Sequence, residues 1–314
     1  MKRLDPTKRA LVISLISEGT PINAVCRILH VGKHAVLRVI EETGEALGDY
    51  MDRTFRNLAV DRLAMDEQWQ YVGMHGLRMA KPEEGRGDFW LWAGIDSDTK
   101  LVVSFLVGRQ DWSASEDFVR DIASRIEGHV QIATDAHRSY VKHIKTYFGD
   151  RGSFSYAIET KMFTTPFSPE DFPNTRRNGI AKIVTAKRKA VYGQPDLRSA
   201  TTCHIERVFL TVRQELKRYQ RLGLGYSKKL SMHRVATALQ IGIYNLCCKH
   251  ISLNGQTPAQ AAGVEKDRWS LERVVALTEA YWAVKDAESK KAQAAAKRVS
   301  EDALFESAFA EMGL

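Results

Sequence analysis

Hydrophobic residues recur at three- and four-residue spacing near the start of the chain, which predicts three short helices. Asp5-Pro6 opens the first helix, and Gly19 closes it. Thr20-Pro21 opens the second, as a capping residue followed by a proline at the first helical position. A turn at Val31-Gly32 then leads into the third. This pattern predicts a helix-turn-helix domain over residues 1–50.

The third predicted helix begins with side chains that suit nucleic acid. Lys33, His34 and Arg38 occupy outward positions, where they can meet phosphates and base edges in a major groove. A small helical packing domain is the alternative, and the pattern alone leaves it open. Residues 51–61 have no strong periodicity and are interpreted as a connector.

From Arg62 the hydrophobic period becomes two, which indicates a strand with Asp66 in its middle. Two runs over 89–95 and 101–107 flank turn residues and predict an antiparallel hairpin. A helix, a strand over 130–134 that ends in Asp135, another helix and a short strand over 154–158 follow. The order predicts an α/β fold, in which helices pack on a mixed sheet.

Residues 201–221 predict one further helix, which Thr201 or Thr202 can cap. Glu206 lies beside its apolar face, among basic residues that include Arg213 and Lys217. A carboxylate in such a setting is either part of a structural ion pair or a metal ligand in a site for a polyanion.

Three acids stand out by position: Asp66, Asp135 and Glu206. If the first and fourth strands are neighbours, the two aspartates come side by side, and a cation between them would relieve their repulsion. Two divalent ions held in this way can activate a water or hydroxyl and stabilise the leaving oxygen of a phosphodiester. Structural alternatives remain open: Asp135 can cap a helix, and Glu206 can pair with Arg213. Glu67 is expected on the opposite face from Asp66, as a surface charge.

The chain resembles bacterial insertion-sequence transposases of the DDE type, in the insertion-sequence-one-like branch, which have a ribonuclease H-like (retroviral-integrase) catalytic fold. Five segments carry the resemblance, in the family's order: MDEQWQYVG (65–73), FWLWAGIDSDTKLVVSFLVG (89–108), GHVQIATDAHRSY (128–140), HIERVFLTVRQELKRY (204–219) and YNLCCKHISLNGQTPAQAAG (244–263).

The resemblance implies that Asp66, Asp135 and Glu206 are catalytic and bind two Mg²⁺ or Mn²⁺ ions. It also implies that Arg213 touches the DNA backbone. Water would cut the element's ends, and the freed 3′-hydroxyl would attack target DNA; oligomers would bridge two ends. The chain departs from the family at Val208 and Phe209, where relatives commonly carry two amides. A non-catalytic DNA-binding regulator and a nuclease without strand transfer are the rival readings.

Composition agrees with an anionic partner. The 314 residues carry a net charge of +8 with a pI of about 9.2, which favours nucleic acid over a membrane surface. No apolar run is long enough for a membrane span, so the expected location is the cytoplasm, at the bacterial nucleoid. The four cysteines form no CxxC pair, and we expect no zinc site.

A basic segment over residues 161–200 carries eight cations against three acids and four prolines, which predicts an irregular loop. Lys187, Arg188 and Lys189 are its expected DNA contacts, although a solvated loop is the alternative. The segment belongs to a catalytic domain over residues 62–265. Residues 266–314 predict a helical tail that could support self-association.

Overall fold

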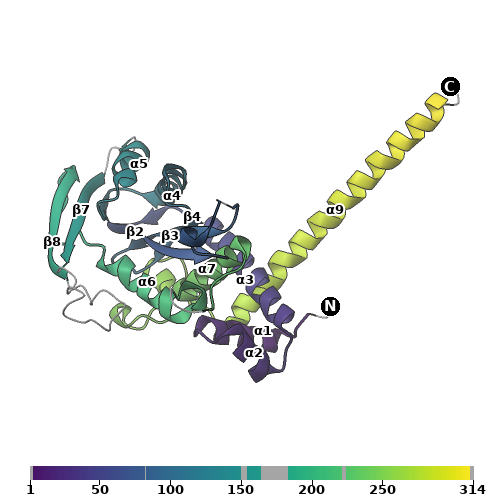
Figure 1. Ribbon diagram of the computed structural model, residues 1–314, viewed down its shortest axis with the longest axis horizontal. Coiled ribbons are helices and arrows are strands. Elements are labelled where there is room, and N and C mark those ends of the chain that lie inside the picture. Colours follow the sequence, from purple (N-terminus) through teal and green to yellow (C-terminus); the bar gives the residue numbers. More distant parts are fainter. Residues whose placement is uncertain (1–2, 82, 150–153, 164–182, 221–223, 312–314) are drawn as a thin grey trace.

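A six-stranded mixed sheet forms the centre of the computed structural model, which describes residues 3–81, 83–149, 154–163, 183–220 and 224–311 (Figure 1). Its strands run in the order β4-β3-β2-β6-β7-β8. They span β2 Arg62–Val72, β3 Gly87–Asp96, β4 Val102–Gly108, β6 Val130–Thr134, β7 Phe154–Phe163 and β8 Ile183–Tyr192. A separate two-stranded sheet joins β1 Leu58–Ala59 to β5 Ile126–Glu127.

The direction of each strand follows from its connection. The long connection over 73–86 and the short turn over 97–101 make β2, β3 and β4 antiparallel, whereas helical crossovers make β6 parallel to β2 and β7 parallel to β6. In chain order, the main sheet begins with β2, β3, β4, β6 and β7 as its first to fifth strands. Across the sheet these five lie in the order third, second, first, fourth, fifth, and β8 forms an antiparallel edge beside β7. This confirms the predicted α/β class with a ribonuclease H-like sheet, in which the first and fourth strands are neighbours.

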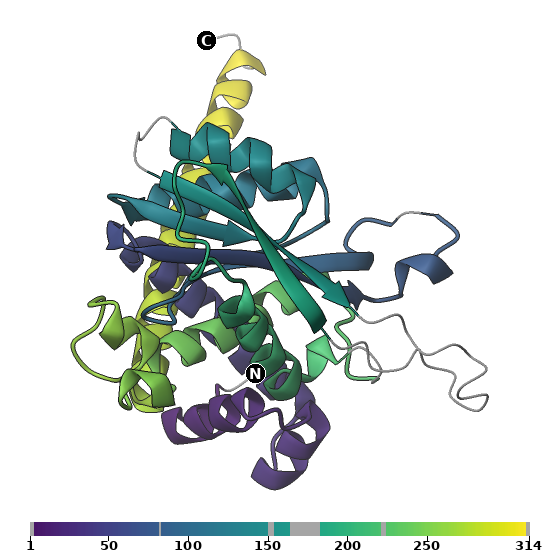
Figure 2. The same ribbon diagram turned by 90° about the vertical axis from the view of Figure 1, so that its left-hand side faces the viewer.

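Helices cover both faces of the sheet (Figure 2). One layer contains α4 Trp112–Arg125 and α5 Arg138–Gly149, and the other contains α6 Cys203–Glu215 and α7 Leu230–Leu246. The smaller elements are the 3₁₀ turns η1 Gly76–Arg78, η2 Lys217–Tyr219 and η3 Ile251–Leu253 and the short helix α8 Pro258–Ala261. Large buried side chains such as Trp92, Phe118 and Tyr140 fill the space between sheet and helices.

The N-terminal helices are α1 Pro6–Ser17, α2 Ile22–Leu29 and α3 Lys33–Thr54. Asp5 caps α1 as predicted, because its carboxylate accepts a hydrogen bond from the Lys8 amide. The start of α2 differs from the prediction. Pro21 is the N-cap residue, so proline precedes the helix and Thr20 does not cap it. The helix α3 continues to Thr54, so the connector predicted over 51–61 begins inside a helix; that helix packs along α7.

The helix predicted over 201–221 is shorter in the structure. Leu216 adopts extended backbone angles and ends α6, after which η2 carries Lys217. Thr202 is the N-cap residue, yet its side chain does not cap the helix. The Thr202 hydroxyl instead lies within hydrogen-bond distance of the carboxylates of Glu159 and Glu206. Asp111 caps α4, because its carboxylate accepts a hydrogen bond from the Ala114 amide.

The basic segment is only partly a loop. Its described residues include the end of β7 and all of β8, so Lys187, Arg188 and Lys189 lie on an edge strand rather than in irregular chain. Residues 161–163 and 183–192 are therefore strand, where an irregular segment was predicted. Residues 164–182, which include Arg176, Arg177 and Lys182, lie outside the described residues.

The last helix, α9 Leu271–Glu311, begins against α1 and α3 and then projects away from the body of the molecule (Figure 1). The predicted helical tail over 266–314 corresponds to this single helix. Among the described helices, none has a stretch both long and apolar enough for a membrane crossing.

Candidate metal centre

Two aspartates meet where β2 and β6 lie side by side. These strands are parallel, and Met65 is paired with Thr134. Asp66 follows Met65 and Asp135 follows Thr134, so the two aspartates are neighbours. Asp66 accepts a hydrogen bond from the Glu67 amide at 2.8 Å, and Asp135 accepts one from the His137 amide at 2.9 Å. Both carboxylates are thus oriented by the backbone that follows them. The pairing of the first and fourth strands, which the sequence left as a condition, brings the two aspartates together.

Glu67 belongs to the same cluster, contrary to the expectation that it is a surface charge. One carboxylate oxygen each from Asp66, Glu67 and Asp135 lie within 4.8 Å of one another. Glu67 is half-buried and accepts hydrogen bonds from Gln110 and from the buried Tyr140, both at 3.0 Å. The β2–β6 pairing ends at Thr134, so Glu67 lies beyond the last paired residue and its side chain can turn toward Asp135. The adjacent Asp-Glu pair at a strand's middle was the sequence signal for it.

Clustering of like charges in a partly buried place strains this site electrostatically. Burial, followed by the charges of Asp135 and Glu67, raises the pKa of Asp66 to about 8. Burial and then Asp135 raise the pKa of Glu67 as well. These groups therefore resist ionising together. A divalent cation would neutralise them, and their oxygen-only donor set fits Mg²⁺ or Mn²⁺.

Glu206 approaches the cluster from α6, but in this structure its carboxylate is held elsewhere. It accepts a hydrogen bond from the Thr202 hydroxyl at 2.7 Å and forms an ion pair with Lys161 of β7. Lys161 also donates to Thr202 at 2.9 Å. Within the described chain, Glu206 is not in the 4.8 Å group of acids, although its negative charge raises the pKa of Asp66 after the larger effects of burial, Asp135 and Glu67.

A buried glutamate that the sequence did not reveal fixes the start of α6. Glu159 of β7 is 3% exposed and accepts hydrogen bonds from the amide and hydroxyl of Thr202 at 2.9 and 3.1 Å. Arg188, directly opposite on β8, donates to it at 2.9 Å. Burial alone would raise the pKa of Glu159, but these hydrogen bonds outweigh burial and lower it. Glu159 thus ties β7, β8 and the Glu206 helix together.

The three basic residues of β8 consequently differ from one another. Arg188 is bound to Glu159 and to the carbonyls of Leu197 and Arg198. Lys187 and Lys189 are exposed and, by strand alternation, point to the face opposite Arg188. Charged lysines on an edge strand also discourage unwanted pairing with other strands.

The remaining predicted DNA-contact residues lie on two surfaces. Arg213 of α6 donates to Gln68 of β2 at 2.6 Å, which places its guanidinium beside the strand that carries Asp66. Lys217 lines a groove of about 820 Å³ together with Lys33, His34 and Arg38 of α3. The structure therefore brings the predicted helix-turn-helix contacts and Lys217 to one place.

Val208 and Phe209 both face the interior of the protein. They are 5% and 3% exposed and belong to the main hydrophobic core. At these positions α6 packs on the molecule instead of presenting amides to a ligand.

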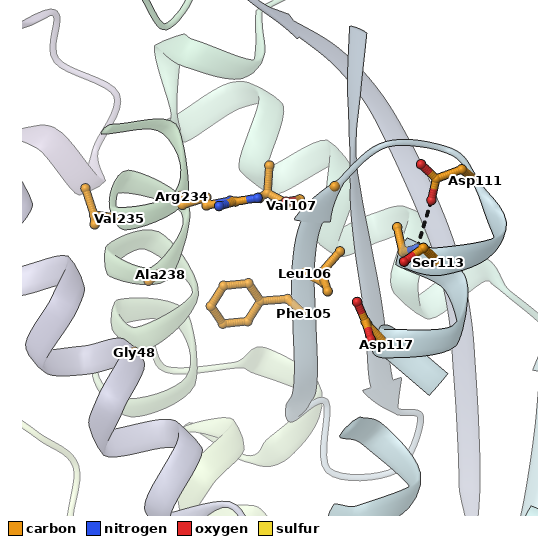
Figure 3. A pocket seen from close by; sticks show the side chains of 12 residues that line it. Gly48, Phe105, Leu106, Val107, Asp111, Ser113, Asp117, Arg234, Val235 and Ala238 are labelled. Atoms are coloured by element: carbon orange, nitrogen blue, oxygen red, sulfur yellow. Dashed lines mark hydrogen bonds between the residues drawn. The ribbon is translucent and has the colours of Figure 1, made fainter. Parts of the chain in front are cut away.

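A different cavity, of about 540 Å³, lies along β4 and α7 and is lined by Phe105, Val107 and Arg234 (Figure 3). Its two carboxylates have structural partners: Asp111 caps α4, and Asp117 pairs with Arg120. The strand β4 is at the sheet edge opposite β8, away from the aspartates. This cavity is therefore not the acidic site.

Comparison with known proteins gives weak structural likenesses. No protein-family profile and no curated protein sequence matches the chain. Among solved structures, it is similar to the Mos1 transposase paired-end complex with left transposon end, with a TM-score of 0.22 and 12% identity over 49% of this chain and 60% of that one. A Mos1 strand transfer complex gives a TM-score of 0.24 and 10% identity over 78% of each chain. The Mos1 mariner paired end complex with Mn gives 0.20 and 11%, over 49% and 59%.

Proposed function

We propose that this chain is a DNA transposase of the DDE insertion-sequence type, in the insertion-sequence-one-like branch. It would cut the ends of its element and join the freed 3′-hydroxyl to target DNA. The observation that carries the proposal is the pair Asp66, in the middle of β2, and Asp135, directly after the end of the parallel strand β6, with Glu206 nearby on α6.

The chain's own residues would provide positioning and charge. Asp66, Asp135 and Glu206 would hold two Mg²⁺ or Mn²⁺ ions, which when bound activate the attacking oxygen and stabilise the leaving one. Thr202 and Glu159 fix the start of α6 and so limit where Glu206 can reach. This division suits phosphoryl transfer, which asks a protein mainly for positioning and neutralisation of charge.

Two sets of cations are suited to DNA. Lys33, His34 and Arg38 would read or hold the element's end, while Arg213 and Lys217 would contact the backbone nearer the acids. Lys187 and Lys189 offer a further exposed pair, and Arg188 would act by holding Glu159. Two copies would bridge two ends.

Two observations favour a second candidate, a DNA-binding regulator without catalysis. Glu206 is paired with Lys161 apart from the aspartates, and Val208 and Phe209 are core residues where family members commonly carry amides. In that case the helix-turn-helix alone would bind DNA, and the three acids would have no catalytic role.

Strand cleavage on the element's own terminal DNA distinguishes these functions. The wild type would be incubated with labelled end duplexes, target plasmid and Mg²⁺ or Mn²⁺. We expect end cleavage and joining, both lost in Asp135→Asn. The matched control is Asp96→Asn, because Asp96 is a buried acid of the same sheet that accepts from Thr99 in a turn. Binding without strand chemistry in the wild type would favour the regulator, and cleavage without joining would favour a nuclease.

A further inference from the structure

Aromatic side chains follow the acids along β2. Glu67, Trp69 and Tyr71 alternate on one face of the strand, and all three are half-buried. The β2–β6 pairing stops at Met65, so in the described sheet this part of β2 is paired only with β3. Trp69 and Tyr71 therefore lie past the point where the pairing with β6 ends, directly beyond the acidic cluster.

Two more rings extend this group into an aromatic strip, which we define as Trp69, Tyr71, His75 and Tyr226. The ring centroids of Trp69 and His75 are 5.0 Å apart, and those of Tyr71 and Tyr226 are 4.9 Å apart. The ring centroids of Tyr71 and Trp69 are 6.0 Å apart. The far end of the strip carries a cation, since the Lys228 ammonium is 3.2 Å from the centre of the Tyr226 ring.

Beyond Tyr226 the strip meets the groove between the helix-turn-helix and the segment that joins α6 to α7. The groove has a basic lining: Lys33, Arg38, Lys217, Arg218, Lys228 and Lys229, against the single acid Glu41. Within the described residues, none of these six cations forms an ion pair with a carboxylate. Arg218 is half-buried, its guanidinium donates to the Ser227 hydroxyl at 3.1 Å, and burial lowers its pKa. Cations left without protein counterions suit a polyanion.

We propose that the aromatic strip is a binding site for unpaired nucleotides of the DNA strand that is processed at the acids. Bases inside a duplex are covered by their neighbours, so only a base that has left the stack can lie against a protein ring. A row of rings beside a basic groove is the arrangement that proteins use to hold single strands. The strand would run from the groove, past Tyr226 and Tyr71, to Trp69 beside Asp66 and Glu67.

This site refines the proposed function, because it specifies that the DNA end is opened near the acids. A purely structural role for the rings, as packing that supports the end of β2, is the competing explanation. The two explanations differ in one respect. If the rings only support the end of β2, changing them will affect DNA affinity equally whether or not the DNA has unpaired bases.

The test measures DNA binding without catalysis, by fluorescence anisotropy in EDTA with the Asp135→Asn protein as background. The probes are a mixed-sequence single strand, a blunt duplex, and the same duplex with a short single-stranded end. We expect Trp69→Leu to weaken binding of the two probes with unpaired bases by about tenfold and to leave the blunt duplex unchanged. Trp69→Phe should recover most of the loss. Trp112→Leu, an exposed tryptophan on α4, is the matched control and should change neither.

A second measurement changes the DNA instead of the aromatic strip. Replacing the bases of the single-stranded end by abasic sugars should cost the Asp135→Asn protein the same factor of about ten, and cost the Trp69→Leu form nothing further. Equal weakening of duplex and single-strand binding by Trp69→Leu would overturn the proposal, and so would abasic ends that bind as well as intact ones. Because no strand is cut in this assay, preferential binding of unpaired ends would survive even if the wild type proved unable to cleave DNA.

Discussion

Asparagine at position 66 should make the metal-free protein more stable at neutral and alkaline pH. Burial and the neighbouring carboxylates raise the pKa of Asp66 from 3.8 to about 8, so ionising it in the folded protein is unfavourable. A change of that size corresponds to roughly 6 kcal/mol of differential stability at full ionisation. We expect about 3 kcal/mol for Asp66→Asn, because the amide is itself partly buried and the remaining acids can relax.

The sign of the pH dependence follows from proton binding. Between about pH 4 and pH 8 the folded protein keeps the Asp66 proton while the unfolded chain has released it, so folded-state stability falls as the pH rises. The advantage of Asp66→Asn should therefore be near zero at pH 4 and reach its full size at about pH 8. With divalent metal the wild type should become more stable than Asp66→Asn, because the ion binds the folded wild type and has one ligand fewer in the variant.

Urea unfolding in EDTA at several pH values, repeated with Mg²⁺, measures both effects. Asp117→Asn provides the control, because Asp117 lies on the exposed side of α4 and pairs with Arg120. A variant that is no more stable than the wild type at pH 8, or a stability difference that does not change with pH, would refute the electrostatic account of the cluster.

Two other predictions concern the residues around Glu206. Lys161→Met should tighten Mn²⁺ binding by about tenfold in calorimetry, because Lys161 competes with the ion for the Glu206 carboxylate. The gain in affinity should vanish in Glu206→Gln protein. Equal Mn²⁺ affinity in the wild type and in Lys161→Met would exclude this competition. Arg188→Ala should lower the free energy of unfolding by about 3 kcal/mol because it removes the guanidinium that pairs with buried Glu159, whereas Lys189→Ala should stay within about 0.5 kcal/mol. Equal effects in the two variants would contradict the distinct roles assigned on β8.

The sequence predicted the features that depend on strand order. Period-two alternation located Asp66 on a strand and a short apolar run placed Asp135 at a strand end. Parallel pairing of the two strands then follows from the helical connections between them, and with it the closeness of the aspartates. These predictions succeeded because hydrophobic period and connection length are local properties of the chain.

Features that depend on register were missed. Alternation assigned Glu67 to the far face, but the end of β6 lets it join the aspartates. Glu159 and Lys161 have roles only because the β7–β8 hairpin faces the start of α6, a contact between segments about forty residues apart. Prolines concealed the strand over 183–192, since they indicated a loop for the whole basic segment. None of these contacts leaves a periodic signal in the sequence.

Crystals soaked in Mn²⁺ and measured for anomalous scattering would show whether the acidic cluster binds metal. We expect anomalous density between the carboxylates of Asp66 and Asp135, with Glu206 turned from Lys161 toward the ion. Crystals of Asp66→Asn should lack this density, and those of Asp96→Asn should keep it. Density that is absent from the wild type, or that appears only at acids outside this cluster, would contradict the assignment of a metal-dependent catalytic site to these residues.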